Sequence, residues 1–183
     1  MASDARVRYT KMIIKQQFAE LLKEMPLKRV TVKAICDRAE INRATFYRYY
    51  NDPYDLMDQI EEEFLTDLME KLGQSSTKGI KENFLVIMEK MKGNIALYQA
   101  LFSENGDRRF LERLIILCYQ GSAVALHQKF EHLSLQEQEY LYYFLAHGCS
   151  GILTQWVSGG METPIDQVAD FTERLYENAI RGM

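Results

Sequence analysis

The sequence predicts an all-α protein, and three observations support this fold class. Apolar residues recur three and four positions apart in most segments, as on one face of a helix. No run alternates apolar and polar residues over the length of a strand, and the three prolines lie near expected helix breaks. The 183 residues are 47% hydrophobic, which is enough to bury a sizeable core. We therefore expect about nine helices, arranged as a three-helix head on a larger helical body.

Capping residues place the helices of the first 73 residues. The first is expected over residues 6–24, and its predicted apolar stripe comprises Met12, Ile13, Phe18, Leu21 and Leu22. Side chains that accept hydrogen bonds from free N–H groups then start three more helices. These starts are Thr31 for a helix ending near Arg38, Asn42 for one ending near Tyr49, and Asp52 with Pro53 for one reaching Gly73.

The remaining residues predict five further helices. Three are expected over residues 77–92, 95–103 and 107–130. Ser134 and Glu137 have the spacing of a capping box and open the next, which ends at Gly159 and Gly160. We expect Thr163 to cap the last helix, with Pro164 at its first position.

Charge is unevenly distributed along the chain. Residues 1–60 carry 11 Lys and Arg against 8 Asp and Glu, whereas residues 61–183 carry 11 against 18. A basic first third on an acidic remainder suggests a head that binds a polyanion. Chance clustering of surface charges is the alternative.

Other bulk features bear on location. No stretch of about 18 apolar residues predicts a membrane span, and the first residues lack the apolar run of a secretory signal. The three cysteines are far apart and odd in number, as expected of free thiols in a reducing compartment. We therefore expect a cytoplasmic protein with no membrane partner.

The stretch INRATFYRYY, residues 41–50, carries the chemistry that bears most directly on function. Phe46 and Tyr50 are four apart and share one helix face, where they anchor the helix, whereas Tyr47 and Arg48 face outward. A short helix, a tight turn and a second short helix form a helix-turn-helix, whose second helix enters the DNA major groove. Arg43 can donate two hydrogen bonds to guanine, and tyrosine hydroxyls can bind phosphates. Simple solvation of these residues is the competing interpretation.

The stretch TVKAICDRAEINRATFYRYYNDPYDLMDQI, residues 31–60, resembles the DNA-binding region of the TetR/AcrR family of bacterial transcriptional regulators. The resemblance covers about residues 8–62 and implies a DNA-binding domain over 1–55 and a regulatory and dimerisation domain over 56–183. Glu40 stands where the family usually has glycine, and Pro53 where many members carry a phosphate-binding lysine. The resemblance implies DNA contacts by Thr31, Asn42, Arg43, Ala44, Thr45, Tyr47, Arg48 and Tyr49.

Family resemblance also implies that the body forms a dimer, and two helical stripes agree with this. The first stripe includes Leu141 and Leu145 together with expected interface residues, and its small glycines would allow another helix to approach closely. Ordinary packing within one chain is the alternative. The expected interface residues are Phe144, Gly148, Gly151, Ile152, Trp156, Phe171 and Leu175.

A ligand pocket in the body is a further expectation that the family implies. The stretch LYQALFSENGD, residues 97–107, resembles a subgroup typified by a dihydroxyacetone-kinase operon regulator. Methionine and aromatic stripes are also ordinary core, so a reduced pocket or none is the alternative. The candidate lining residues are Phe84, Met88, Met91, Tyr98, Phe102, Phe110, Leu114, Cys118, Tyr119 and His147.

The sequence therefore predicts a sequence-specific DNA-binding regulator. We expect a dimeric repressor that binds a pseudopalindromic double-stranded operator and is released by a small-molecule effector. The alternative is a partner-dependent co-regulator with weak or no DNA binding of its own. No Ser/His/Asp set, carboxylate pair or phosphate loop stands out, so no enzyme activity and no cofactor are expected. His127 and His132 are five apart and do not share a helix face, so no metal site is expected.

Overall fold

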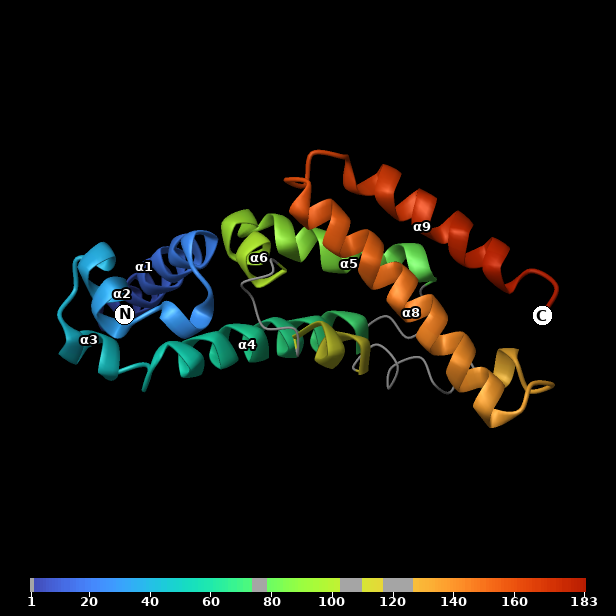
Figure 1. The fold of residues 1–183 in the computed structure, drawn as a ribbon, viewed down its shortest axis with the longest axis horizontal. Helices are drawn as coiled ribbons and strands as arrows, with labels where there is room; N and C mark the ends of the chain where they lie inside the picture. The colour runs from blue at the N-terminus through green and yellow to red at the C-terminus, as the bar shows by residue number, and fades with distance from the viewer. Residues whose placement is uncertain (1, 74–78, 103–109, 117–126) are drawn as a thin grey trace. The chain divides into compact units, whose positions relative to one another are not determined.

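The computed structural model describes residues 2–73, 79–102, 110–116 and 127–183 (Figure 1). Within these ranges the regular structure is helical and contains no strand. The all-α prediction is confirmed. No helix in the described ranges is long and apolar enough to cross a membrane.

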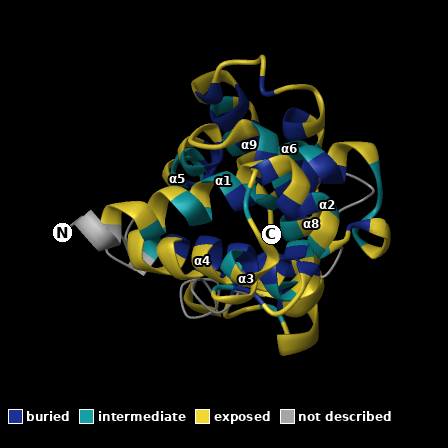
Figure 2. Ribbon diagram, turned by 90° about the vertical axis from the view of Figure 1, so that its left-hand side faces the viewer, coloured by how far each residue is buried: buried dark blue, intermediate teal, exposed yellow. Residues whose placement is uncertain are grey.

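The chain forms two compact units. The first unit comprises Met1–Phe64 and Asn94–Arg108, and the second comprises Leu65–Gly93 and Arg109–Met183. Most helices carry both buried and exposed positions, as expected of helices that pack by one face (Figure 2). The division into a DNA-binding domain over 1–55 and a regulatory domain over 56–183 stays a prediction.

The first unit contains α1 (Ala2–Glu24), η1 (Leu27–Arg29), α2 (Val32–Ala39), α3 (Arg43–Tyr47), the first part of α4 (Pro53–Gly73) and α6 (Ile95–Leu101). The three predicted caps are confirmed. The Thr31 hydroxyl accepts a hydrogen bond from the Ala34 N–H at 3.1 Å, and the Asn42 Oδ1 accepts from the Thr45 N–H at 2.7 Å. The Asp52 Oδ1 accepts from two N–H groups in the first turn of α4.

Helix α1 packs against α2 and α6 within the first unit. Its fully buried side chains include Ile14, Phe18 and Leu22, which are four residues apart and share one face. Met12 was predicted on this face but is 52% exposed, because it lies off the line that Ile14 and Phe18 define. Apolar content alone did not reveal which neighbouring residue faces the core.

The second unit contains the rest of α4, α5 (Ile80–Lys92), helical residues 110–116, α8 (Leu135–Ser158) and α9 (Ile165–Ile180). The predicted capping box is confirmed, because Ser134 and Glu137 exchange both side-chain-to-backbone hydrogen bonds. Helix α9 packs against α5 and α8, and the Lys81 ammonium on α5 pairs with Asp170 on α9 at 2.5 Å. Of the helix predicted over 107–130, residues 117–126 lie outside the described ranges.

The predicted start of the last helix is wrong by one position. Helix α9 begins after Pro164, which is its N-cap, and no side chain caps it. The Pro164 carbonyl accepts from the N–H groups of Gln167 and Val168. Thr163 is held differently, because its carbonyl accepts a hydrogen bond from the Trp156 indole N–H at 2.8 Å. The hydrogen bond from Trp156 on α8 therefore holds Thr163, the residue that the sequence pattern predicted as the cap of α9.

Some residues of the predicted apolar stripe of α8 are buried in the core of the second unit, whereas others are exposed. Leu141 and Leu145 are buried with Phe130, and the side chains of Tyr176 and Ile180 cover this cluster. These residues therefore serve the intrachain core, contrary to the prediction that Leu141 and Leu145 share one stripe with the interface residues. Phe144 lies between them in sequence and is 68% exposed.

Candidate nucleic-acid interface

The turn between α2 and α3 depends on one residue in a left-handed conformation. Glu40 has φ 52° and ψ 40°, and its N–H donates to the Cys36 carbonyl. The Ile41 N–H donates to the same carbonyl at 3.1 Å. These two bonds close α2 and redirect the chain into α3. Glu40, where the family usually has glycine, therefore adopts a left-handed backbone, a region that a side chain makes costly.

Helix α3 is anchored by the two aromatic residues that the spacing predicted. Phe46 and Tyr50 are 0% and 1% exposed, and their ring centroids are 5.6 Å apart. Because this face is buried, the opposite face is exposed: Arg43, Ala44, Tyr47 and Arg48 are all exposed. A guanidinium, a methyl group and a phenol on one exposed face can contact base edges and phosphates.

Three other predicted contact residues also hold the local fold. The Asn42 Oδ1 accepts from the Thr45 N–H and from the Thr45 hydroxyl at 2.9 Å. The Asn42 amide N–H₂ and the lone pairs of Thr45 are not used in these bonds. Thr31 is exposed, and its hydroxyl oxygen caps α2. Each of these residues therefore combines a structural bond with polar atoms that can face a ligand.

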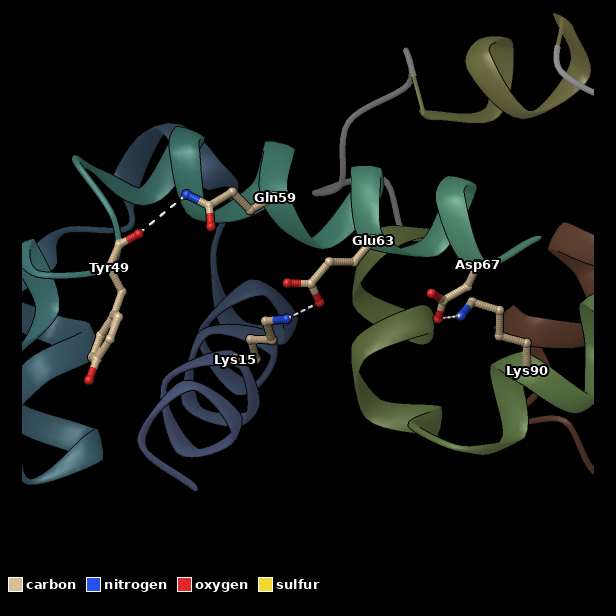
Figure 3. A network of polar contacts seen from close by, with 6 residues as sticks. All are labelled: Lys15, Tyr49, Gln59, Glu63, Asp67 and Lys90. Atoms are coloured by element: carbon tan, nitrogen blue, oxygen red, sulfur yellow. Dashed lines mark hydrogen bonds and ion pairs between the residues drawn. The ribbon is translucent and has the colours of Figure 1, made fainter. Parts of the chain in front are cut away.

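The chain that follows α3 is tied to the first two turns of α4. The Gln59 side-chain amide donates to the Tyr49 carbonyl at 3.3 Å and to the Asp55 carboxylate at 3.0 Å. The same carboxylate accepts from the Asn51 backbone N–H at 2.6 Å and from the Asn51 side chain. Figure 3 shows the Tyr49 carbonyl pointing at Gln59 while its ring points away from α4. These bonds lower the pKa of Asp55, chiefly through the Asn51 N–H.

Ion pairs neutralise some of the cations around this surface but not those on α3. Lys15 pairs with Glu63 on α4 (Figure 3), Lys23 with Glu20, and Arg38 with Glu24 at 2.6 Å. Among the described residues, no ion pair involves Arg43 or Arg48. The two arginines can therefore bind an anion without breaking a bond inside the chain.

The sequence reasoning missed two residues next to this surface. Gln59 lies on α4, and Lys11 on α1 has its ammonium 5.7 Å from the Tyr49 ring centroid and 5.9 Å from that of Tyr50. Neither belongs to a local pattern with residues 41–50, because the contacts join segments far apart in the chain. No sequence signal near the helix-turn-helix could have identified them.

A second exposed surface lies on α8 and α9 in the second unit. Both helices line an open depression of about 1010 Å³, and six residues that we predicted to bind a second chain or a ligand belong to its lining. A Cβ at Gly148 or Gly151 would meet no atom within 4 Å, so both positions face open space. Phe171 and Leu175 are 49% and 46% exposed, whereas Trp156 is buried. The six lining residues are His147, Gly148, Gly151, Ile152, Trp156 and Phe171.

The predicted pocket residues do not all share one environment. His147 is exposed on α8, in the depression, and its ring stacks on Tyr143 at 6.1 Å. Cys118 and Tyr119 lie outside the described residues. The other seven are buried: Tyr98 and Phe102 in the first unit, and Phe84, Met88, Met91, Phe110 and Leu114 in the second.

Comparisons with known proteins match both parts of the chain. A family model described as "Bacterial regulatory proteins, tetR family" matches residues 19–60. A TetR C-terminal model described as "Transcriptional regulator C-terminal region" matches residues 78–178, more than half of the chain. No curated protein gives a significant match.

Three solved structures share the fold. A structure titled "Dihydroxyacetone kinase operon activator DhaS" has 22% identity and a TM-score of 0.64, over 94% of this chain and 96% of that one. The fatty acid degradation regulator FadR from Bacillus halodurans has 12% identity and a TM-score of 0.71, over 94% and 96%. A TetR transcriptional regulator from Streptococcus agalactiae 2603V has 20% identity and a TM-score of 0.66, over 96% and 98%.

The two family models together cover the helix-turn-helix, with its exposed α3 face, and most of the second unit. The chain therefore belongs to the TetR family of bacterial transcriptional regulators and is a DNA-binding regulatory protein.

Proposed function

We propose that this protein is a dimeric repressor that binds a pseudopalindromic operator and is released by a small-molecule effector. The observation that carries the proposal is the division of α3 into two faces. Phe46 is completely buried, whereas Arg43, Tyr47 and Arg48 are exposed and belong to no ion pair among the described residues. A helix anchored in this way presents a rigid cationic face to the major groove.

The residues that we propose to contact DNA fall into two groups. Arg43 and Ala44, in the first turn of α3, would face base edges, where arginine reads guanine and a methyl group contacts thymine. The others would bind phosphates and so fix the position of the helix without reading sequence. The phosphate group comprises Thr31, Asn42, Thr45, Tyr47, Arg48 and Tyr49.

Dimerisation through α8 and α9 is supported by their exposed apolar surface. Phe144, Phe171 and Leu175 are at least 46% exposed, which is unfavourable for large apolar side chains in a lone chain. Gly148 and Gly151 leave room for a partner helix to approach closely. A two-fold dimer would present two copies of α3 to the two halves of an inverted repeat.

Release by an effector requires that a ligand bind one conformation more tightly than the other. The buried aromatic and methionine side chains of α5 and of residues 110–114 are the candidates for such a pocket. An apolar, largely neutral effector would suit them, because most of the predicted lining residues carry no charge.

Selection of bound fragments from random DNA at fixed, moderate salt tests the operator proposal. We expect enrichment of an inverted repeat. Arg43→Ala should then weaken operator binding by about 1–3 kcal/mol and relax one base position in each half-site. Lys23→Ala is the control, since Lys23 lies on α1 and is paired with Glu20. Equal loss for both variants would contradict a base-reading role for Arg43.

The sign of regulation needs its own measurement. One structure with the same fold is titled an operon activator. A reporter placed behind the selected operator should show lower transcription when the protein is present. Higher transcription would replace repression with activation and leave operator binding intact.

The second candidate function is that of a partner-dependent co-regulator with weak DNA binding. Its support is the strained turn at Glu40 and the absence of a lysine at position 53, where a buried proline opens α4. The double substitution Glu40→Gly with Pro53→Lys would relieve the strain and add a cation. A large rise in DNA affinity would favour this candidate, and Glu40→Gly alone separates the backbone contribution from that of the charge.

A further inference from the structure

Tyr49 lies in a segment that helix hydrogen bonds do not hold. Helix α3 ends at Tyr47, and α4 begins at Pro53. The Tyr49 N–H donates to the Phe46 carbonyl at 2.9 Å, and its carbonyl accepts from Gln59. These bonds fix the main chain of Tyr49 but leave the direction of its ring to be set by side-chain contacts.

Lys11 on α1 supplies such a contact. Its ammonium lies 5.7 Å from the Tyr49 ring centroid and 5.9 Å from the Tyr50 ring centroid. A cation within about 6 Å of a ring centroid is attracted by the negative face of the ring. No ion pair among the described residues involves Lys11, so no carboxylate competes with the two rings.

The two rings differ in how firmly they are held. Tyr50 is 1% exposed and packs against Phe46, so its ring is fixed by the core. Tyr49 is only half-buried, and its ring lies 6.4 Å from that of Tyr50. The Lys11 ammonium therefore lies between a ring fixed by the core and the less buried ring of Tyr49. Lys11 thus connects α1 to the Tyr49 ring, while Gln59 on α4 holds the Tyr49 carbonyl.

We propose that Lys11 is a positioning residue for the binding of DNA phosphate by Tyr49. This inference rests on the proposed DNA-binding function, in which the Tyr49 hydroxyl donates to a phosphate oxygen. A ring held in one direction loses less conformational freedom when its hydroxyl binds, so the contact becomes more favourable. Lys11 acts through the ring and does not itself need to reach the DNA.

The test uses a random-sequence DNA duplex of about 30 base pairs and fluorescence anisotropy, because phosphate contacts contribute to binding of any sequence. Lys11→Met should raise Kd by about 2–5-fold, the effect of one exposed cation–π contact, and Lys11→Arg should restore binding. Lys23→Met is the control, because it removes the same charge from the same helix at a residue that pairs with Glu20 and lies over no ring among the described residues.

Two readouts separate positioning from a direct phosphate contact. In a Tyr49→Phe background the hydroxyl is gone, so Lys11→Met should have almost no further effect on Kd. The slope of log Kd against log salt should stay unchanged in Lys11→Met, whereas loss of a direct contact would reduce it by about 0.9. Additive effects of Lys11→Met and Tyr49→Phe, or a reduced slope, would overturn the inference.

Stability and the proposed function are checked in the same series. Thermal unfolding of each variant shows whether the fold is intact, and Lys11→Gln replaces Lys11→Met if the latter unfolds. Binding by the wild-type protein at about 50 mM salt supports the proposed function, whatever the combination of Lys11→Met with Tyr49→Phe shows about Lys11. Absence of wild-type binding under these conditions would count against the proposed function itself.

Discussion

Tyr50 carries a hydroxyl group that folding removes from water. The side chain is 1% exposed, and the hydroxyl has no hydrogen-bond partner among the described residues. Burial, and to a lesser degree the nearby Glu63 carboxylate, raises the pKa of this phenol, so it stays protonated at neutral pH. A buried polar group without a partner costs free energy that an apolar group of the same shape avoids.

We therefore expect Tyr50→Phe to stabilise the protein by about 1 kcal/mol. The ring packing against Phe46 is kept, and only the unsatisfied oxygen is lost. Urea unfolding followed by circular dichroism measures the change. Tyr47→Phe is the control, because the Tyr47 hydroxyl is on an exposed side chain and its loss should change stability little. A lower stability of Tyr50→Phe would mean that the hydroxyl has a partner in solution.

At the same residue scale, the sequence predicted the anchor but not its supports. The four-residue spacing of Phe46 and Tyr50 is enough to place both on one helix face. The contacts of Lys11 and Gln59 with Tyr49 bridge 38 and 10 residues of chain, since they join α1 and α4 to the segment between α3 and α4. Local periodicity contains no information about such contacts, because it describes one helix at a time.

Helix α4 begins with a set of polar bonds centred on Asp55. Its carboxylate accepts from the Asn51 backbone N–H, from the Asn51 side chain and from Gln59. Because these bonds lower the pKa of Asp55, they favour the ionised form in the folded protein. The stabilisation is therefore complete above the ordinary aspartate pKa of about 3.9 and is lost as pH falls through the lower folded value.

We expect Asp55→Asn to lower the free energy of unfolding at neutral pH. The difference from wild type should begin to shrink as pH falls below about 3.9, where the unfolded chain takes up the proton first, and should be smallest below the lower folded pKa of Asp55. Chemical unfolding at a series of pH values measures this. Asp58→Asn, at an exposed position on the same helix, is the matched control. A difference that persists unchanged at low pH would show that the charge of Asp55 does not matter.

Helix α8 offers a test of the dimer face at the scale of one element. A Cβ at Gly148 meets no atom within 4 Å, so a side chain can begin there without a clash inside the single chain. Helix propensity also favours leucine over glycine, by about 0.8 kcal/mol. In a dimer with a closely packed partner helix, the same side chain would collide with that helix.

Gly148→Leu should therefore dissociate the proposed dimer without unfolding the chain. Analytical ultracentrifugation measures the oligomeric state, and circular dichroism checks helix content. Glu139→Leu is the control, because residue 139 is exposed on α8 and nine positions from Gly148, half a turn away around the helix. A dimer that tolerates leucine at Gly148 would place the interface elsewhere.

At the scale of single elements, sequence patterns were sufficient to predict most helix starts. Four helix starts were predicted from capping side chains, at Thr31, Asn42, Asp52 and Ser134, and each accepts the expected hydrogen bond. The start after Thr163 was wrong, since the Thr163 carbonyl is engaged by Trp156. A cap depends on a few neighbouring residues, so it can be predicted unless a distant side chain intervenes.

At the scale of the whole molecule, the proposed dimer would carry two DNA-binding heads, which would constrain the spacing of the operator. Recognition helices related by a two-fold axis would read half-sites about one helical turn apart, about 34 Å. Sequence-specific binding then depends on both half-sites facing the same side of the duplex.

Insertion of about 5 base pairs between the half-sites should turn one half-site to the far side of the duplex and strongly weaken binding. Gel-shift titration with the selected operator measures this. An operator with one scrambled half-site is the control, and its affinity should be close to that of the respaced operator. Unchanged affinity after the insertion would indicate that a single head binds.

The sequence by itself determined the helical fold, the positions of most helix starts and the two faces of α3, and its motif identified the family. Each of these depends on residues within a few positions of one another, through capping, spacing or turn geometry. The tertiary structure decided which apolar residues of α1 and α8 are buried, because packing selects one side of a wide stripe. It also decided that Lys11 contacts the Tyr49 ring and Gln59 the Tyr49 carbonyl, since only folding brings α1 and α4 to the segment after α3.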